Sequence, residues 1–393
     1  MTKQYDFDKI IDRHGTNALK TDVLTVRYGR SDLLPLWVAD MDFETPDFIM
    51  EALRERLNHP VLGYTKNPDG YYPAIQKWLL TVHGWTIQSE WLRYIPGVVK
   101  GIGFAVNVFT KPGDRIIIQP PVYHPFHLVP RGNGREIVYN PLTLLDDGLY
   151  AMDFNQLEQT LSNGDCKLLI LSNPHNPGGI VWDKATLLRL ADLCDRYHTL
   201  VIADEIHADL TLYGHQYTPF ATVSEAAKLN SITFGAPSKT FNIAGVVSSF
   251  AVIPNDAVRK AFYTWLSANE LDEPTIFAPI ATEVAYIQGY EWLQALKRYL
   301  EGTIDFVDDY LSEHNLGIKA IKPQATYLVW LDCRALKLTQ ADLVDLFVNK
   351  AHLALNDGAM FGPGGDGFMR MNVATPRRII EQALENLRQV IEK

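Results

Sequence analysis

Three polar side chains follow three apolar runs of the sequence, at the points where predicted β-strands end. Asp204 lies at the end of LVIADEI, Lys239 follows SITFGAPS, and Asn176 lies in the proline- and glycine-rich loop NPHNPGG. In open α/β sheets, ligands bind where the chain leaves the carboxyl edge of the strands. A carboxylate, an amine and an amide that converge at this edge are typical of a binding site.

Each of these residues also has an ordinary structural interpretation. Asp204 could cap the next helix through its side chain, and Lys239 could be a solvated loop lysine, since lysine is mostly exposed. Glu205 points to the opposite face of the strand from Asp204, so only one of the two carboxylates can face the site. The combination of three polar side chains at one sheet edge favours a site.

The elements that must position these side chains alternate between apolar strands and amphipathic helices from residue 47 to 285. Two predicted strands, 167–174 and 200–206, flank a predicted helix at 184–198, and further strands follow at 231–239 and 246–253. This order predicts an α/β fold with a mostly parallel sheet.

The length of 393 residues exceeds what one hydrophobic core usually organises, so we expect two packed domains. The large domain spans residues 47–285. A smaller α+β domain spans 286–393 and includes a predicted helix at 340–352. Residues 1–46 show no regular periodicity, and we expect them to pack as an arm against the small domain.

The order of four motifs, N-P-G around Asn176, D-E at Asp204, S-K-T at Lys239 and R-x-N at Arg370, resembles the class I/II aminotransferase superfamily of fold-type I pyridoxal-phosphate (PLP) enzymes. The resemblance covers nearly the whole chain. It implies an aspartate-aminotransferase-like fold and PLP as the cofactor.

The resemblance also implies a role for each of these residues. Lys239 would bind the cofactor aldehyde covalently and then serve as the base that removes the substrate Cα proton. Asp204 would keep the pyridine nitrogen protonated. Asn176 would donate to the phenolic oxygen of the ring and contribute to substrate binding. Arg370 would bind the substrate carboxylate with its guanidinium fork, although a surface salt bridge is the alternative.

Further cofactor contacts follow from the same resemblance. The segment IPGVVKGIG enters a helix whose N-terminus would bind the phosphate through the backbone N–H groups of Gly97, Val98 and Val99. Ser238 would add a hydroxyl donor. Tyr64, in LGYTKNPDG, would reach the phosphate and the substrate in the neighbouring subunit, so we expect a homodimer with shared active sites.

Within the superfamily, the chain is most similar to the cystathionine β-lyases of the MalY/PatB type, in segments such as LPLWVADMDFETP, PPVYHPF, ADEIHADL and SKTFNIAG. Tyr123 matches the aromatic residue that stacks on the cofactor ring and takes part in catalysis, with an ordinary core tyrosine as the alternative. His207 stands where aminotransferases have a tyrosine. Val247 replaces the arginine that normally binds the phosphate.

This likeness predicts a PLP-dependent carbon–sulfur β-lyase that converts L-cystathionine or another S-substituted cysteine to a thiol, pyruvate and ammonia. A thiolate is a fair leaving group near neutral pH, because thiols have a pKa of about 8.5. An aminotransferase is the alternative among enzymes. A non-catalytic regulatory domain is a further alternative, but it requires a DNA-binding segment for which the chain has no room.

Composition limits the partners of the protein. The net charge of −10, without a dense basic run, argues against nucleic acid as a partner. The partner that the family resemblance implies is a small amino-acid substrate. The three cysteines form no metal-ligand spacing, which indicates a reducing compartment and no metal site. The N-terminus lacks the apolar stretch of a signal peptide, and no run reaches the roughly 20 residues that cross a bilayer. We therefore expect a soluble, cytoplasmic protein.

Overall fold

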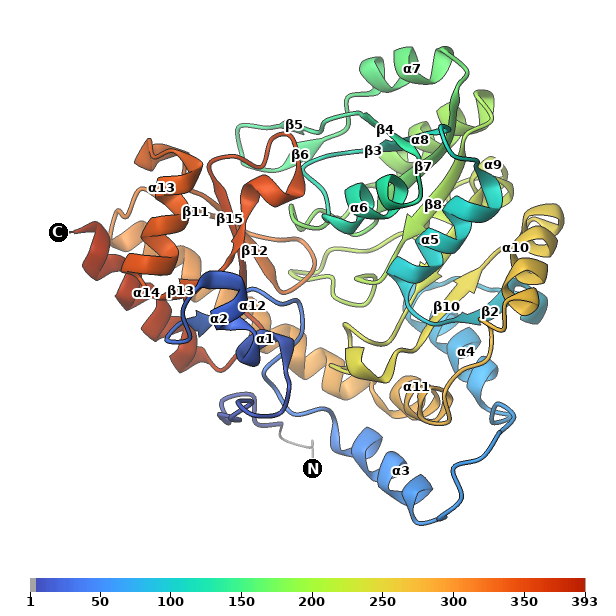
Figure 1. Ribbon diagram of the computed structural model, residues 1–393, viewed down its shortest axis with the longest axis horizontal. Helices are drawn as coiled ribbons and strands as arrows, with labels where there is room; N and C mark the ends of the chain where they lie inside the picture. Colours follow the sequence, from blue (N-terminus) through green and yellow to red (C-terminus); the bar gives the residue numbers. More distant parts are fainter. Residues whose placement is uncertain (1–4, 393) are drawn as a thin grey trace.

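The computed structural model describes residues 5–392 and contains two main sheets, each covered by helices (Figure 1). The larger sheet has seven strands, in the spatial order β2 (Leu92–Ile95), β10 (Ser249–Val252), β9 (Ser231–Gly235), β8 (Leu200–Asp204), β7 (Cys166–Ser172), β3 (Arg115–Ile118) and β4 (Glu136–Tyr139). β10 pairs antiparallel with β2 and β9, and the remaining pairs are parallel. The predicted α/β fold with a mostly parallel sheet is confirmed.

Helices pack on both faces of this sheet because its apolar side chains alternate between the two faces. Ile116 and Ile118 of β3 belong to one buried cluster, whereas Ile117 belongs to the cluster on the other face. The first face is covered by α5 (Val98–Phe109), α6 (Pro125–Gly132) and α10 (Asp256–Ala268). The second is covered by α7 (Phe154–Ser162), α8 (Lys184–Arg196) and α9 (Glu225–Leu229).

The smaller sheet is antiparallel, in the order β11 (Lys319–Ile321), β12 (Leu328–Asp332), β15 (Phe368–Asn372) and β14 (Asn356–Asp357). Its core includes side chains of α12 (Tyr290–Glu313), α13 (Gln340–Asp345) and α14 (Arg377–Ile391). The helix predicted at 340–352 is shorter, because α13 passes into a wider π-helical turn at Leu346–Lys350.

The N-terminal segment lies beside the smaller sheet (Figure 1). It contains α1 (Leu19–Asp22), α2 (Leu24–Tyr28) and β1 (Leu34–Pro35), and β1 pairs in parallel with β13 (Leu353–Ala354). The segment then leads to α3 (Asp47–Leu57) and α4 (Tyr71–His83). A small hairpin, β5 (Thr143–Leu144) with β6 (Tyr150–Ala151), completes the strands.

The domain boundaries at residues 46 and 285 stay a prediction. α11 (Phe277–Gln288) passes through position 285, and one buried cluster includes side chains of α4, α11, α12 and the smaller sheet. None of the helices between residues 5 and 392 is long and apolar enough to span a membrane.

Candidate active site

A cavity of about 280 Å³ lies at the carboxyl edge of the parallel strands. All sequence-predicted site residues except Arg370 and Tyr64 line it, namely Lys239, Asp204, Asn176, Tyr123, Gly97, Val98, Val99, Ser238 and His207. Side chains from separate strand ends therefore meet in one place, which is the arrangement that the sheet order predicts.

Asp204 is the last residue of β8 and is buried at the cavity. Its Oδ1 accepts a hydrogen bond of 3.1 Å from the Ile206 N–H, and no residue between 5 and 392 donates to its other oxygen. The segment after Asp204 is a turn, so the helix-cap interpretation is wrong. Burial raises the pKa of Asp204 to about 6, against the opposing effects of the Ile206 bond and the Lys239 charge.

Glu205 points away from the cavity, as the alternation of the strand requires. Its carboxylate accepts hydrogen bonds from Asn173 Nδ2 at 3.0 Å, from the Phe220 N–H at 2.8 Å and from the Tyr217 hydroxyl. All of its contacts thus belong to the other side of the strand, and Asp204 is the carboxylate that faces the site.

Lys239 lies half-buried in the turn after β9. Its Nζ donates a hydrogen bond of 2.6 Å to the carbonyl of Ala39, and the Tyr327 hydroxyl donates to the same carbonyl at 2.9 Å. Burial lowers the pKa of Lys239 to about 8, while nearby Asp40 and Asp204 oppose this shift. The interpretation of Lys239 as a solvated loop lysine is therefore wrong, and its amine can exchange a proton near neutral pH.

Arg370 is buried on β15 and makes no ion pair with a carboxylate of the described chain. Its terminal nitrogens donate to Asn176 Oδ1 at 2.9 Å, to Asn356 Oδ1 at 2.6 Å and to the Trp37 carbonyl at 3.2 Å, whereas Nε has no partner. Burial lowers its pKa to about 10. The surface salt-bridge interpretation is wrong, since this guanidinium is held by neutral oxygens.

The bond from Arg370 also fixes the orientation of the Asn176 amide. A guanidinium only donates hydrogen bonds, so Oδ1 of Asn176 must face Arg370, and Nδ2 is left to donate to another group. The backbone of Asn176 is fixed too, because its carbonyl accepts a 3.0 Å bond from the Tyr123 N–H. Asn176 thus connects the cavity to Arg370, which does not line it.

His207 lies in the turn after Asp204 and is fully enclosed. Burial and, to a smaller extent, the charges of Lys239 and Arg370 lower its pKa to about 3, so the imidazole is neutral at physiological pH. Its Nδ1 is buried without a hydrogen-bond partner among the described residues. A buried nitrogen that lacks a partner at a cavity wall is suited to contact a ligand.

The start of α5 forms another part of the cavity wall. Gly97, the N-cap, has φ +122°, which favours glycine, and the first N–H groups of the helix are not used within it. Such a helix N-terminus attracts anions. The predicted strand at 246–253 begins only at Ser249, because Val247 adopts a left-handed conformation with φ +58° in the cavity wall.

Two residues at the site escaped the sequence reasoning. Lys100, in the first turn of α5, lines the cavity. Val247, which replaces the family's phosphate-binding arginine, lines the same cavity. Asp209 is buried behind the Lys239 turn and accepts a bond from Thr240. Lys100 lies in the motif IPGVVKGIG and Asp209 in ADEIHADL. The residues that surround them in the structure come from distant segments of the sequence.

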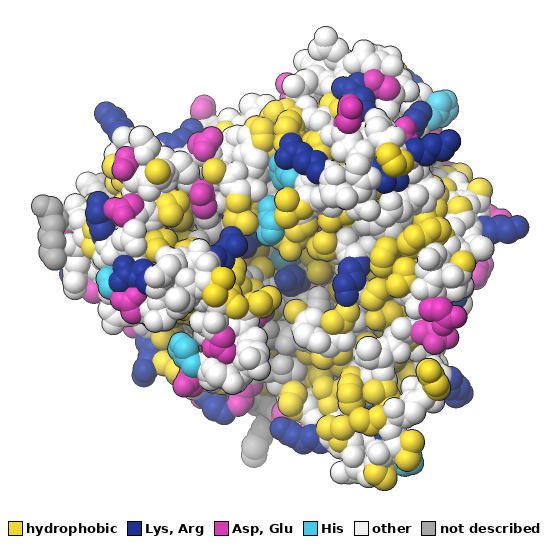
Figure 2. Space-filling model, in the orientation of Figure 1, with side chains coloured by type: hydrophobic (Ala, Val, Ile, Leu, Met, Phe, Trp, Pro, Cys, Tyr) yellow, Lys and Arg dark blue, Asp and Glu magenta, His cyan; other side chains and the backbone are white. Residues whose placement is uncertain are grey.

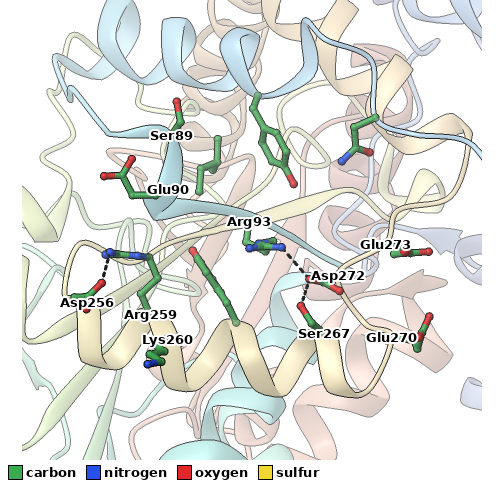
Figure 3. A pocket seen from close by; sticks show the side chains of 14 residues that line it. Ser89, Glu90, Arg93, Asp256, Arg259, Lys260, Ser267, Glu270, Asp272 and Glu273 are labelled. Atoms are coloured by element: carbon green, nitrogen blue, oxygen red, sulfur yellow. Dashed lines mark hydrogen bonds and ion pairs between the residues drawn. The ribbon is translucent and has the colours of Figure 1, made fainter.

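Tyr64 does not reach the cavity of its own chain. It is fully exposed in the loop between α3 and α4 and lines a separate surface hollow of about 750 Å³ together with Asp272 and Glu273. A neighbouring hollow of about 820 Å³ shares those two acidic residues and contains no predicted site residue (Figure 3). In it Arg93 points toward Asp272 at 3.1 Å, so its charges are partly paired already.

The family model for aminotransferase class I and II matches residues 31–387. The chain is similar to PatB, a cystathionine beta-lyase of Bacillus subtilis strain 168, with 43% identity over 383 residues, 98% of this chain and 99% of the relative.

Two solved structures are similar over the whole chain. The PLP-bound C-S lyase of Staphylococcus hominis has a TM-score of 0.91 and 32% identity, covering 100% of this chain and 99% of the other. A PLP-bound presumed aminotransferase of Clostridium difficile 630 has a TM-score of 0.96 and 42% identity, covering 99% of this chain and 100% of the other.

Proposed function

This chain belongs to the class I and II aminotransferase family, and within it we propose that the protein is a PLP-dependent carbon–sulfur β-lyase. It acts on S-substituted cysteines such as L-cystathionine, consumes water, and releases a thiol, pyruvate and ammonia. The observation that carries this proposal is the 43% identity to a cystathionine beta-lyase over 98% of the chain, supported by the likeness to a C-S lyase structure.

The residues of the cavity fit PLP. Asp204 offers a buried carboxylate with an oxygen that no described residue contacts, which suits a protonated ring nitrogen. His207 offers a buried nitrogen without a partner. Gly97 and the start of α5 offer N–H groups for an anion at the cavity wall. One cavity thus supplies a group for each polar part of the cofactor.

Lys239 would hold the cofactor covalently through Nζ, and Tyr123 would pack against its ring. Gly97, Val98, Val99 and Ser238 would bind the phosphate. Lys100 can supply the positive charge that the missing arginine at position 247 would have provided. A cation in the first turn of a helix is favourable only when an anion is also present, and the bound phosphate would be that anion. Bound PLP supplies an electron sink that stabilises negative charge on the substrate Cα.

Once the substrate amine has displaced Nζ from the cofactor, Lys239 would act as the proton acceptor. Its pKa of about 8 allows Nζ to take the substrate Cα proton near neutral pH, and the Ala39 carbonyl is positioned to hold the resulting ammonium. The Tyr327 hydroxyl orients that carbonyl by donating to it. The bond from Cβ to sulfur then breaks, and the electron pair leaves with the sulfur as a thiolate.

Arg370 binds the α-carboxylate of the substrate. No carboxylate of the described residues competes for its guanidinium, and its Nε is without a partner. A substrate carboxylate can take the place of the Trp37 carbonyl or the Asn356 amide oxygen, because bonds between two charged groups are stronger, while the bond to Asn176 Oδ1 stays. Asn176 adds its Nδ2 on the same side.

An aminotransferase is the second candidate, favoured by the likeness to the Clostridium difficile structure. The two reactions share the removal of the Cα proton by Lys239 and differ in the fate of the Cβ–S bond. An aminotransferase needs a keto acid to complete its cycle, whereas a lyase does not. Release of pyruvate from L-cystathionine with and without 2-oxoglutarate is the experiment that separates them.

We propose further that the active form of the protein is a homodimer. Tyr64 is exposed together with Val61 and Leu62 in one loop, and an apolar loop of this kind is suited to an interface. In a dimer Tyr64 would complete the neighbouring site.

The buried free thiols of Cys166, Cys194 and Cys333 support a reducing, cytoplasmic location.

A further inference from the structure

An arginine of the N-terminal segment lies near the site without a carboxylate partner. Arg27 of α2 is exposed, and none of the Asp or Glu side chains between residues 5 and 392 forms an ion pair with it. Figure 2 shows a hollow at the centre of the face where the N-terminal segment and the smaller sheet meet the larger sheet, with Lys, Arg and His side chains around it. This hollow is suited to an anionic ligand.

Aromatic rings hold the Arg27 side chain in place. Its guanidinium carbon lies 4.9 Å from the centre of the Trp37 ring and 5.8 Å from that of Tyr28. The two rings pack edge to face at 5.7 Å, and the Tyr28 hydroxyl donates to the Leu355 carbonyl at 3.0 Å. A guanidinium stacked on such a support keeps its N–H groups available for a carboxylate.

The same support connects Arg27 to the substrate side of the site. The carbonyl of Trp37 accepts a bond from Arg370, so the two arginines contact opposite ends of one residue. His124 lies beside the ring of Tyr123 at 5.1 Å between centroids. Burial lowers the pKa of His124 to about 4, and the charges of Arg370 and Arg27 contribute, so both cations are near it.

We propose that Arg27 binds a second, distal carboxylate of the substrate while Arg370 binds the α-carboxylate. The preferred substrates are then S-substituted cysteines whose thiol portion itself ends in a carboxylate, as in cystathionine. This inference rests on the proposed lyase function and concerns its specificity. A cysteine with an uncharged S-alkyl group has only the α-carboxylate, so Arg27 does not strengthen its binding.

The test compares two substrates in three variants. Wild-type protein, Arg27→Gln and Arg27→Lys are loaded with PLP, and kcat and KM are measured with L-cystathionine and with S-ethyl-L-cysteine. Arg27→Gln should lower kcat/KM for cystathionine about fivefold through a higher KM, which is typical of the loss of one exposed charge pair. The value for S-ethyl-L-cysteine should stay unchanged, and Arg27→Lys should recover part of the loss.

Arg189→Gln is the matched control. Arg189 is also exposed and lies 4.4 Å over an aromatic ring, that of Phe154, but it belongs to α8 on the other face of the larger sheet. It should leave both substrates unaffected. An equal change for both substrates in Arg27→Gln, or no change for cystathionine, would overturn the inference while the lyase function stands. Failure of the lyase function would appear differently, as no pyruvate from either substrate with wild-type protein.

Discussion

Thr240 Oγ1 donates a hydrogen bond of 2.7 Å to Asp209 Oδ2, which ties the residue after Lys239 to the turn after β8. The other oxygen of Asp209 accepts from Trp78 Nε1 at 2.9 Å and lies 2.7 Å from His83 Nε2, both on α4. Burial alone raises the pKa of Asp209, but the bonds from these partners outweigh it and lower the pKa. A charged, fixed carboxylate therefore anchors the turn that presents Lys239.

Replacement of Thr240 tests this anchor. Thr240→Val removes the hydroxyl with little change in volume, so the turn loses its bond to Asp209 and Lys239 is less well oriented. We expect kcat to fall about tenfold or more with little change in KM, because small displacements of catalytic groups are costly. Thr240→Ser keeps the donor and should restore kcat. Equal activity in the Val and Ser variants would contradict the role of this bond.

The pKa of Asp204 predicts a pH dependence of stability in protein prepared without PLP. The folded-state pKa is about 6 and the ordinary value is 3.8, so the folded protein binds the proton more tightly. The stabilisation is fully present below the unfolded pKa and is lost as pH rises through about 6. Asp204→Asn cannot ionise, so it should gain on the order of 3 kcal/mol over wild type between about pH 4 and pH 7.

Chemical unfolding at several pH values measures this difference. If the free energy of unfolding depends on pH in the same way for wild type and Asp204→Asn, the raised pKa is refuted. With PLP bound, the same variant should lose turnover by about a hundredfold or more, because the ring nitrogen loses its charged partner. Asp204→Ala should likewise lower turnover, and far more than it lowers stability, since it too removes the buried ionisable carboxyl.

The sequence predicted the strands and the residues at their ends well. Apolar runs with alternating faces define β7, β8 and β9, and Asp204 and Lys239 follow from where those runs end. These features depend on local periodicity, which a single sequence contains.

The contacts that complete the site could not be predicted in the same way. The Trp37 carbonyl is 333 residues away from Arg370 in the sequence, and Thr240 is 31 residues away from Asp209. Such pairs depend on how the N-terminal segment and the two sheets pack together, which no local pattern encodes. The sequence likewise contains Lys100 in a recognised motif, but it does not show that this residue lies at the cavity.

Lys239 should be the attachment point of the cofactor. Purified protein should be yellow, and borohydride reduction should fix PLP to the peptide that contains Lys239. Lys239 lines the cavity together with Asp204, and burial keeps part of its amine neutral and reactive. Mass spectrometry of the digested protein locates the modification. Modification of another lysine would refute the assignment.

Mixed dimers test the contribution of Tyr64 to the neighbouring site. A Tyr64→Ala chain and a Lys239→Ala chain should each be weakly active or inactive alone. After subunit exchange, one of the two sites in a mixed dimer has both native residues, so activity should return in part. Exchange is verified with differently tagged chains. Absence of recovery despite verified exchange means that Tyr64 serves its own chain or none.

The most direct test of the lyase function follows pyruvate and free thiol from L-cystathionine, with and without 2-oxoglutarate. A lyase returns to its starting form in every cycle, so we predict continuous release of pyruvate and homocysteine in equal amounts without any keto acid. Lys239→Ala is the inactive control. Product formation that stops after one turnover unless 2-oxoglutarate is present, with no thiol released, would contradict the account and identify the protein as an aminotransferase.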